Sequence, residues 1–171
     1  MEQLIKTIIL GIIQGLTEWL PISSTGHLKL AEHFLNLDAP MLFDVILHVG
    51  TLAVIFIFFR KDIKNILSAL VHFDFKTENG KLIPLIIAGT IPTALIGLVF
   101  GDLIENTFQD MLPIAMAFII CGIMLYLSKF GKEENDTIDY LAAVLIGTAQ
   151  GIAIIPGVSR NGTTIATTLL L

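Results

Sequence analysis

The residues best suited to chemistry in this sequence occur in two similar stretches, residues 11–27 and residues 147–164. Each stretch carries a glutamine, a proline and a serine among glycines. The matched pairs, offset by 136 or 135 positions, are Gly11 and Gly147, Gln14 and Gln150, Gly15 and Gly151, Pro21 and Pro156, and Ser24 and Ser159. A duplicated segment in which proline ends an apolar helix and polar residues follow indicates a site between two membrane repeats.

Glu18 is the candidate acid of the first stretch. It follows Gln14 by four residues, so both side chains are expected on the same helix face. A carboxylate inside an apolar run is costly unless it is paired, neutralised or bound to a metal. We therefore expect a functional acid that can hold a divalent ion. The competing interpretation is a structural glutamate, with Gln14 joining two helices.

A polar segment, Ser23-Ser24-Thr25-Gly26-His27, follows the proline of the first stretch. One of its hydroxyls is expected to cap a helix. Backbone donors and hydroxyls at a helix N-terminus also form an anion site. His27 is a candidate general acid, base or nucleophile, and a histidine satisfied within the core is the alternative.

Arg160 is the candidate anion clamp of the second stretch. It follows a short apolar helix and sits among small polar residues, namely Gly157, Ser159, Asn161, Gly162, Thr163 and Thr164. A guanidinium there needs an anion, and its planar fork suits phosphate. A structural ion pair with Glu18 is the alternative.

Three further residues that could serve a site or packing lie within apolar runs. His48 is expected to line the same cavity, with Asp44 one helical turn earlier, unless both are packing residues. Cys121 is the single cysteine, which excludes a disulfide framework and a cysteine metal site. We expect it to serve packing.

Composition indicates an integral membrane protein, because 54% of the 171 residues are hydrophobic and only 15% are charged. The apolar runs are residues 4–20, 41–59, 82–100, 113–127 and 140–155. As helices, the second and third would be about 28 Å long, enough to span, whereas the first and last are shorter and end at prolines. A net charge of −5 without a basic stripe argues against nucleic acid as a partner.

The charged loops predict an orientation. Basic residues cluster between the second and third runs and after the fourth, whereas residues 101–112 hold acids without a base. The basic residues are Arg60, Lys61, Lys64, Lys76, Lys81, Lys129 and Lys132. By the positive-inside rule the basic loops are cytoplasmic and residues 101–112 are external.

The predicted fold is an all-α polytopic membrane protein with an inverted-topology repeat and two re-entrant broken helices. Residues 1–139 form the first repeat, a re-entrant pair plus three spans, and residues 140–171 begin a second repeat that is expected to be truncated. A single crossing of residues 4–37, which gives parallel repeats, is the alternative. Opposed re-entrant loops are preferred, because exposed backbone is tolerated in a membrane only when protein or a cavity covers it.

These residues together suit phosphoryl chemistry, in which positioning and charge neutralisation dominate catalysis. Enclosure in a membrane indicates a substrate with a lipid tail. At the same residues the chain resembles the undecaprenyl-pyrophosphate phosphatase family, also called bacitracin-resistance proteins. The resemblance covers the whole chain and rests on Gln14-x-x-x-Glu18, on residues 20–27 and on Pro156-Gly-Val-Ser-Arg160 with the four residues that follow.

The resemblance implies a membrane enzyme that removes the terminal phosphate of undecaprenyl pyrophosphate and so recycles the lipid carrier for cell-wall synthesis. It implies a divalent cation, Mg or Ca, held by Glu18 and Gln14, and makes Ser24 or His27 the nucleophile. Arg160 would bind the phosphates. The other expected substrate-binding residues are Gln14, Ser23, Thr25, Gly26, Ser159, Asn161, Gly162 and Thr164, with Asn161 replacing a serine that is common in the family.

The expected location is the plasma membrane, with the site opening to the external face. The expected partners are the polyprenyl pyrophosphate and membrane lipid. The sequence leaves open whether the protein forms a homodimer. The alternative functions are a secondary transporter or flippase of a lipid phosphate, and an inactive truncated relative.

Overall fold

The computed structural model of the chain describes residues 1–37, 39–108, 110–131 and 138–171. The described residues form eight α-helices, which confirms the all-α prediction. They are α1 (Glu2–Thr17), α2 (Ser24–Leu35), α3 (Met41–Phe58), α4 (Arg60–Val71), α5 (Glu78–Thr107), α6 (Met111–Ser128), α7 (Tyr140–Ile152) and α8 (Arg160–Leu170). Lys132, which contributed to the predicted orientation, lies outside the described residues.

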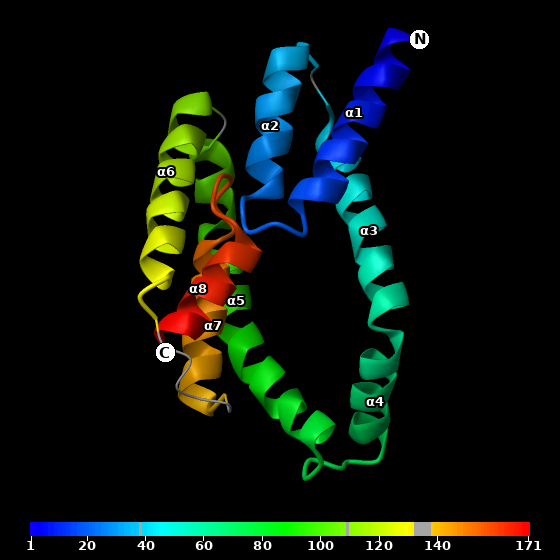
Figure 1. The fold of residues 1–171 in the computed structure, drawn as a ribbon, viewed down its shortest axis with the longest axis vertical. Coiled ribbons are helices and arrows are strands. Elements are labelled where there is room, and N and C mark those ends of the chain that lie inside the picture. The colour runs from blue at the N-terminus through cyan, green and yellow to red at the C-terminus, as the bar shows by residue number, and fades with distance from the viewer. Residues whose placement is uncertain (38, 109, 132–137) are drawn as a thin grey trace.

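The two duplicated stretches form two helical hairpins, α1–α2 and α7–α8, each with its helices packed together. Figure 1 shows α1 running from one end of the molecule to its middle and α2 returning, whereas α7 rises from the other end. The loops of the two hairpins therefore lie near each other at the middle of the molecule.

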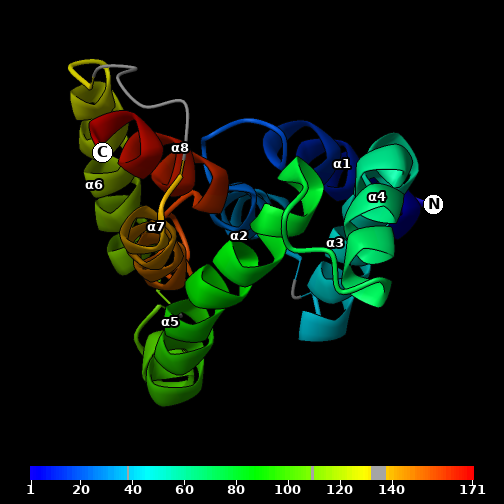
Figure 2. The same cartoon turned by 90° about the horizontal axis from the view of Figure 1, so that it is seen from below.

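Spanning helices are present, as the composition predicts. Helices α5 and α6 are each long and apolar enough to cross a membrane, and α3 with α4 adds a third candidate bent by 78°. The described residues of this membrane protein thus contain two candidate spans, or up to three if the bent pair counts as one. Figure 2 shows the bent pair standing apart from α6, α7 and α8.

Two segments predicted as loops are largely helical. Residues 60–71 form α4, and α5 continues to Thr107 through most of the acidic segment 101–112. Charge signals which side of a membrane a segment occupies, but charged residues such as lysine and glutamate are also good helix formers. The positive-inside argument therefore concerns the side of the membrane and does not predict conformation.

Helix α7 is fixed mainly by α5. Gly147 lies so close to Gly89 that a Cβ on Gly147 would fall 2.0 Å from the Gly89 carbonyl oxygen. The Thr93 hydroxyl donates to the Gly147 carbonyl at 2.6 Å, which adds a hydrogen bond at this crossing. Small residues at the contact let two helices approach, as membrane helix pairs commonly do. The α5–α7 contact therefore sets where the second hairpin presents its loop.

Candidate active site

A cavity of about 210 Å³ lies between the loops of the two hairpins. The first hairpin contributes Thr17, Glu18, Leu20, Ser23, Ser24 and Thr25, and the second contributes Ala153, Ile154, Ile155, Val158, Ser159, Arg160 and Asn161. The cavity therefore combines polar groups from both copies with an apolar wall. We call it the central cavity.

Glu18 is the centre of the polar contacts. It occupies the position directly after α1, with helical backbone angles, and its N–H donates to the Gln14 carbonyl. The Gln14 amide nitrogen donates to Glu18 Oε2 at 2.9 Å, and the Ser24 hydroxyl donates to the same oxygen at 2.5 Å. Hydrogen bonds to a charged acceptor are short and strong, so both donors stabilise the carboxylate. The predicted pairing of Gln14 with Glu18 is confirmed.

The loop after Glu18 aims Ser24 at that carboxylate. Ser23 is buried, has a φ of 65° and caps α2 by accepting a hydrogen bond from the Gly26 N–H at 3.4 Å. Ser24 is consequently the first residue of α2, where backbone N–H groups lack helical partners and favour anions. The prediction that one serine of this segment caps a helix is confirmed for Ser23.

The second loop is built in the same way. Gly157 has a φ of 98°, a left-handed conformation that glycine adopts readily. Ser159 caps α8 by accepting a hydrogen bond from the Gly162 N–H at 3.0 Å. Arg160 is therefore the first residue of α8, and its exposed side chain lines the central cavity. It forms no ion pair with any described residue, so the alternative of a structural Glu18–Arg160 pair is wrong.

The caps correct the register of the duplication. Ser23 and Ser159 cap corresponding helices, and each accepts from the glycine three residues later, so the offset is 136. The sequence comparison pairs Ser24 with Ser159 instead, because it keeps the offset of 135 that relates Pro21 to Pro156. In the structure Ser24 instead corresponds to Arg160. The hydroxyl and the guanidinium thus occupy equivalent positions at the first residues of two helices.

The two loops are joined directly. The Asn161 amide donates to the Glu18 backbone carbonyl at 2.6 Å, although 143 residues separate them. Gly26 lies against Gly157, since a Cβ on Gly26 would fall 3.0 Å from the Gly157 Cα and 2.5 Å from the Phe118 ring. These contacts bring Glu18 of one copy and Arg160 of the other to the wall of one cavity.

Other predicted residues lie next to the cavity rather than on its wall. Gln14 is buried behind Glu18, and the buried Gly162 serves the cap of α8. The Thr164 hydroxyl contacts the Arg160 and Asn161 carbonyls at 3.0 Å each. His27 does not line the cavity, because its Nδ1 contacts the Ser23 carbonyl at 2.7 Å and its ring packs edge-on against Phe118.

His48 comes near Glu18 from α3, but it does not line the central cavity as the sequence predicts. Its Nε2 lies 3.8 Å from Glu18 Oε2, too far for a direct hydrogen bond, and has no hydrogen-bond partner among the described residues. Its Nδ1 contacts the Asp44 carbonyl at 2.8 Å. His48 is not among the residues of the cavity wall, so it borders Glu18 from behind.

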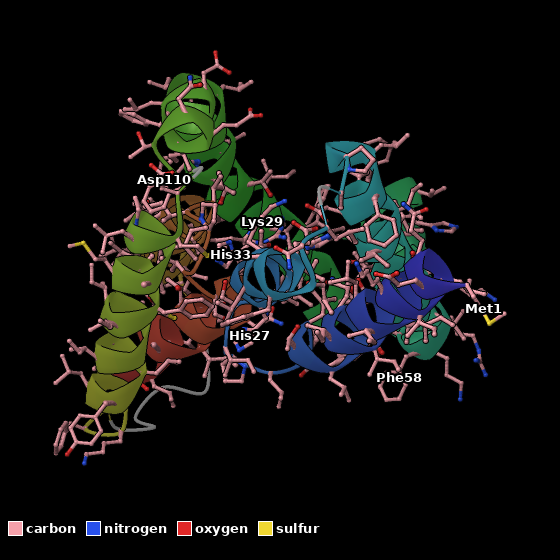
Figure 3. The ribbon with its side chains drawn as sticks, turned by 90° about the horizontal axis from the view of Figure 1, so that it is seen from above. Met1, His27, Lys29, His33, Phe58 and Asp110 are labelled. Carbon is pink, nitrogen blue, oxygen red and sulfur yellow. The ribbon has the colours of Figure 1, made fainter. Side chains whose placement is uncertain are left out.

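The sequence analysis missed an ionic cluster between α2 and α3. Lys29 Nζ lies 2.9 Å from Glu32 Oε2 and 3.0 Å from Asp44 Oδ2. Figure 3 looks along α2 and shows Lys29 and His27 on opposite sides of it, so the cluster faces away from the His27 side. The three-residue spacing of Lys29 and Glu32 was the available signal. Nothing in the sequence linked that pair to Asp44.

The donor atoms around Glu18 are compatible with a hard divalent ion. The Glu18 carboxylate and the Ser24 hydroxyl are oxygen ligands, and Gln14 Oε1 is buried without a hydrogen-bond partner among the described residues. No group of three or more His, Cys, Asp or Glu suited to a metal occurs among the residues described. Magnesium typically takes one or two carboxylates and completes its shell with water and substrate phosphates. The donor set fits that mode of binding.

Cys121 does more than fill space. It is buried in α6, and its sulfur accepts a hydrogen bond from the Ser159 N–H at 3.4 Å. The expected packing role is confirmed by its burial. The additional contact ties α6 to the residue that caps α8.

The fold and the cavity define a helical membrane protein whose central site is assembled from two copies of one hairpin motif. A family model described as bacitracin resistance protein BacA matches residues 7–171. The chain therefore belongs to this family, as its motifs suggested.

Curated relatives are similar over almost the whole chain. The undecaprenyl-diphosphatase of Carboxydothermus hydrogenoformans is 43% identical over 169 residues, which cover 96% of this chain and 62% of that protein. Undecaprenyl-diphosphatase 3 of Bacillus cereus has the same identity and coverage. The undecaprenyl-diphosphatase of Methanosphaera stadtmanae is 36% identical, with coverage of 100% and 68%. The chain spans about three fifths of the length of the first two.

We predict that the Lys29–Asp44 pair stabilises the packing of α3 on the first hairpin. Lys29→Met leaves two largely buried carboxylates without their cation, which typically costs about 3 kcal/mol. The midpoint of thermal unfolding in detergent should fall by roughly 5–10 °C. Adding Asp44→Asn should recover part of the loss, because one uncompensated charge is removed.

Lys6→Met is the matched control, since Lys6 pairs with Glu2, whose side chain is 82% exposed. An exposed pair contributes about 1 kcal/mol or less, so this variant should unfold near the midpoint of the unchanged chain. Equal losses in both lysine variants, or no recovery in the double variant, would contradict a specific role for the cluster.

Proposed function

We propose that the protein is a membrane phosphatase that hydrolyses undecaprenyl pyrophosphate to undecaprenyl phosphate and inorganic phosphate. The relatives whose names carry this activity are longer than this chain, so the proposal concerns the whole protein to which these residues belong. The main support for this proposal is one hydrogen bond in the central cavity. The Ser24 hydroxyl donates to the Glu18 carboxylate inside a cavity that also exposes Arg160.

In the proposed reaction Ser24 Oγ attacks the terminal phosphorus while its proton passes to Glu18. The bond from that phosphorus to the bridging oxygen breaks, and Glu18 protonates the departing undecaprenyl phosphate. Water then attacks the phosphoserine, Glu18 takes one proton from the water, and Ser24 Oγ regains a proton as phosphate leaves. The 2.5 Å contact suits a general base, because a base must lie within hydrogen-bond reach of the proton it takes.

Arg160 and the ends of two helices would bind the phosphates. The guanidinium has five donors in a planar fork, and the first turns of α2 and α8 offer backbone N–H groups to an anion. A divalent ion held by Glu18, Gln14 and phosphate oxygens would neutralise further negative charge. Each of these groups would act where charge develops during phosphoryl transfer.

Ser24 is the favoured nucleophile over His27. Ser24 is on the cavity wall and contacts the base, whereas His27 is off the wall and its Nδ1 contacts the Ser23 carbonyl. We assign His27 to holding the loop that carries Ser24.

The apolar part of the cavity wall supports a lipid substrate. Leu20, Ile154, Ile155 and Val158 line it beside the polar groups. Leu20 is 50% exposed and Ile154 37%, so the apolar surface continues outward from the cavity. A polyprenyl chain would follow this surface while the pyrophosphate occupied the polar end.

The proposed membrane arrangement is an inverted repeat. Residues 1–139 form one repeat and residues 140–171 begin the other, with α1–α2 and α7–α8 as opposed re-entrant hairpins. The opposite directions of the hairpins in Figure 1 support this arrangement, as does the contact between their loops. The site would open to the external face of the plasma membrane, in agreement with the charge of the loops.

We predict that Glu18→Gln lowers phosphate release from undecaprenyl pyrophosphate by at least about a hundredfold, because glutamine cannot accept the proton from Ser24. The assay uses the full-length protein in detergent, where no membrane compartments exist, so release of phosphate also separates hydrolysis from transport. Glu2→Gln, a change at an exposed acid of the same helix, should leave the rate unaltered. Near-normal turnover by Glu18→Gln would remove Glu18 from the mechanism.

We predict that rapid quenching during turnover traps a phosphoserine at Ser24. A phosphoserine survives acid, whereas a phosphohistidine does not, so acid treatment of the labelled protein identifies the nucleophile. Ser24→Ala should abolish the acid-stable label. An acid-labile label lost in His27→Ala would reverse the assignment, and the absence of any label would favour direct attack by water.

We predict that the N-terminus and Asn106 face the outside and Lys76 faces the cytoplasm. Single cysteines at Gln3, Lys76 and Asn106 in a Cys121→Ala background are probed on intact cells with an impermeant thiol reagent. Positions 3 and 106 should react and position 76 should not. Protection at position 3 together with position 76 would instead support the single-crossing model.

A further inference from the structure

Helix α4 carries a second candidate binding surface, far in sequence from the two loops. A groove of about 470 Å³ runs along it, lined by Phe56, Arg60, Ile63, Lys64, Leu67, Ser68, Val71 and His72. We call it the α4 groove. The proposed phosphatase reaction does not use any of these residues.

The lining residues form two parallel rows. Arg60, Lys64, Ser68 and His72 recur every four residues, so these polar side chains follow one line along the helix. Ile63, Leu67 and Val71 have the same spacing and form an aliphatic row beside it. A ligand matching both rows has an anionic or polar group at one side and a hydrocarbon chain at the other.

The groove lies on the side of α4 that faces away from the protein. Ala69 is the buried residue of α4, and Asp62, seven residues earlier, lies on the same side of the helix. Leu67 is 54% exposed and Val71 73%, so the aliphatic row is uncovered. The acid of α4 therefore points away from the groove, and none of the lining residues is a carboxylate.

The position of α4 relative to α3 suits the surface of a membrane. Helix α3 is apolar up to Phe58, and the chain then bends by 78° into α4. With 12 residues α4 is about 18 Å long, too short to span. A short amphipathic helix at the end of an apolar one lies in the interface, with its apolar side chains among lipid.

The basic side chains of Arg60 and Lys61 lie where the apolar helix α3 gives way to the polar membrane interface. Arg60 and Lys61 also line an adjoining hollow with Val54, Ile57 and Phe58, and Phe58 is 75% exposed. Arg60 uses one N–H to bond the Ile57 carbonyl at 3.2 Å, which leaves other donors of its fork free. Long basic side chains at such a boundary extend toward phosphate groups.

We propose that the α4 groove binds an anionic phospholipid. The lipid phosphate lies between Arg60 and Lys64, and an acyl chain follows the aliphatic row. Cations without a facing carboxylate select an anionic headgroup over a zwitterionic one, because the groove offers no partner for a choline cation. The proposal is independent of catalysis, since the groove lies outside the central cavity.

The experiment compares phosphatidylglycerol with phosphatidylcholine of the same acyl chains. Each lipid is titrated into the full-length protein in detergent, and the shift of the unfolding midpoint gives an apparent affinity. Phosphatidylglycerol should bind more tightly than phosphatidylcholine. The double variant Arg60→Gln with Lys64→Gln should lose roughly twenty-fivefold in affinity for phosphatidylglycerol, about fivefold for each basic residue, with little change for phosphatidylcholine.

Two controls separate this site from general basic charge. Lys129→Gln removes a basic residue that packs on the Tyr126 ring at the end of α6, and it should retain the preference. The exchange of Arg60→Lys with Lys64→Arg keeps both charges and should retain it too. If the double glutamine variant does not fold, Lys64→Gln alone should show the fivefold loss.

Three results would overturn the proposal. The first is equal binding of both lipids by the unchanged protein. The second is a preference for phosphatidylglycerol that survives in the glutamine variants. The third is a loss of affinity in Lys129→Gln as large as in the Arg60 and Lys64 variants. Soluble glycerol phosphate should compete poorly, because it lacks the acyl chain. Competition by glycerol phosphate at the same concentration as phosphatidylglycerol would show a site for free phosphate instead.

Discussion

Backbone groups that leave a helix inside a membrane need partners within the protein, because lipid offers none. The two loops of this protein provide such partners through polar contacts. Serines 23 and 159 cap the helices that follow the loops, and the Asn161 amide bonds the carbonyl of Glu18 in the other loop. The Asn161 bond and the packing of Gly26 against Gly157 thus join the two loops directly. The central cavity is the polar space that this mutual burial leaves.

The same constraint determines the chemistry of the cavity. A half-buried carboxylate is tolerated when donors surround it, and Glu18 has the Gln14 amide and the Ser24 hydroxyl. The capping serine places Ser24 at the start of one helix and its counterpart places Arg160 at the start of the other. A duplicated hairpin thereby supplies a hydroxyl from one copy and a guanidinium from the other at equivalent positions. The differences between the copies, rather than their similarity, provide the complementary groups of the site.

Charges away from the cavity divide into two kinds. Lys29 is engaged with two carboxylates and joins α2 to α3, so its charge is neutralised within the protein. Arg60 and Lys64 lie on the uncovered face of α4, and no carboxylate lines their groove. Basic residues that the sequence does not distinguish thus join two helices in one place and present their charge to the surroundings in the other.

The sequence determined the class of the protein, because an apolar composition requires a membrane and spacing alone pairs Gln14 with Glu18 on a helix. It also predicted Ser24, Arg160 and Asn161 as site residues, since polar groups in apolar runs are costly unless they have a function, and all three line the central cavity. It did not determine that α3 bends into α4, that Ser24 corresponds to Arg160, or that Lys29 meets Asp44. These depend on contacts between segments distant in the chain, which residue periodicity does not encode. The choice between Ser24 on the cavity wall and His27 beside Phe118 likewise became visible only in the tertiary structure, because both residues belong to one short segment and only packing separates their environments.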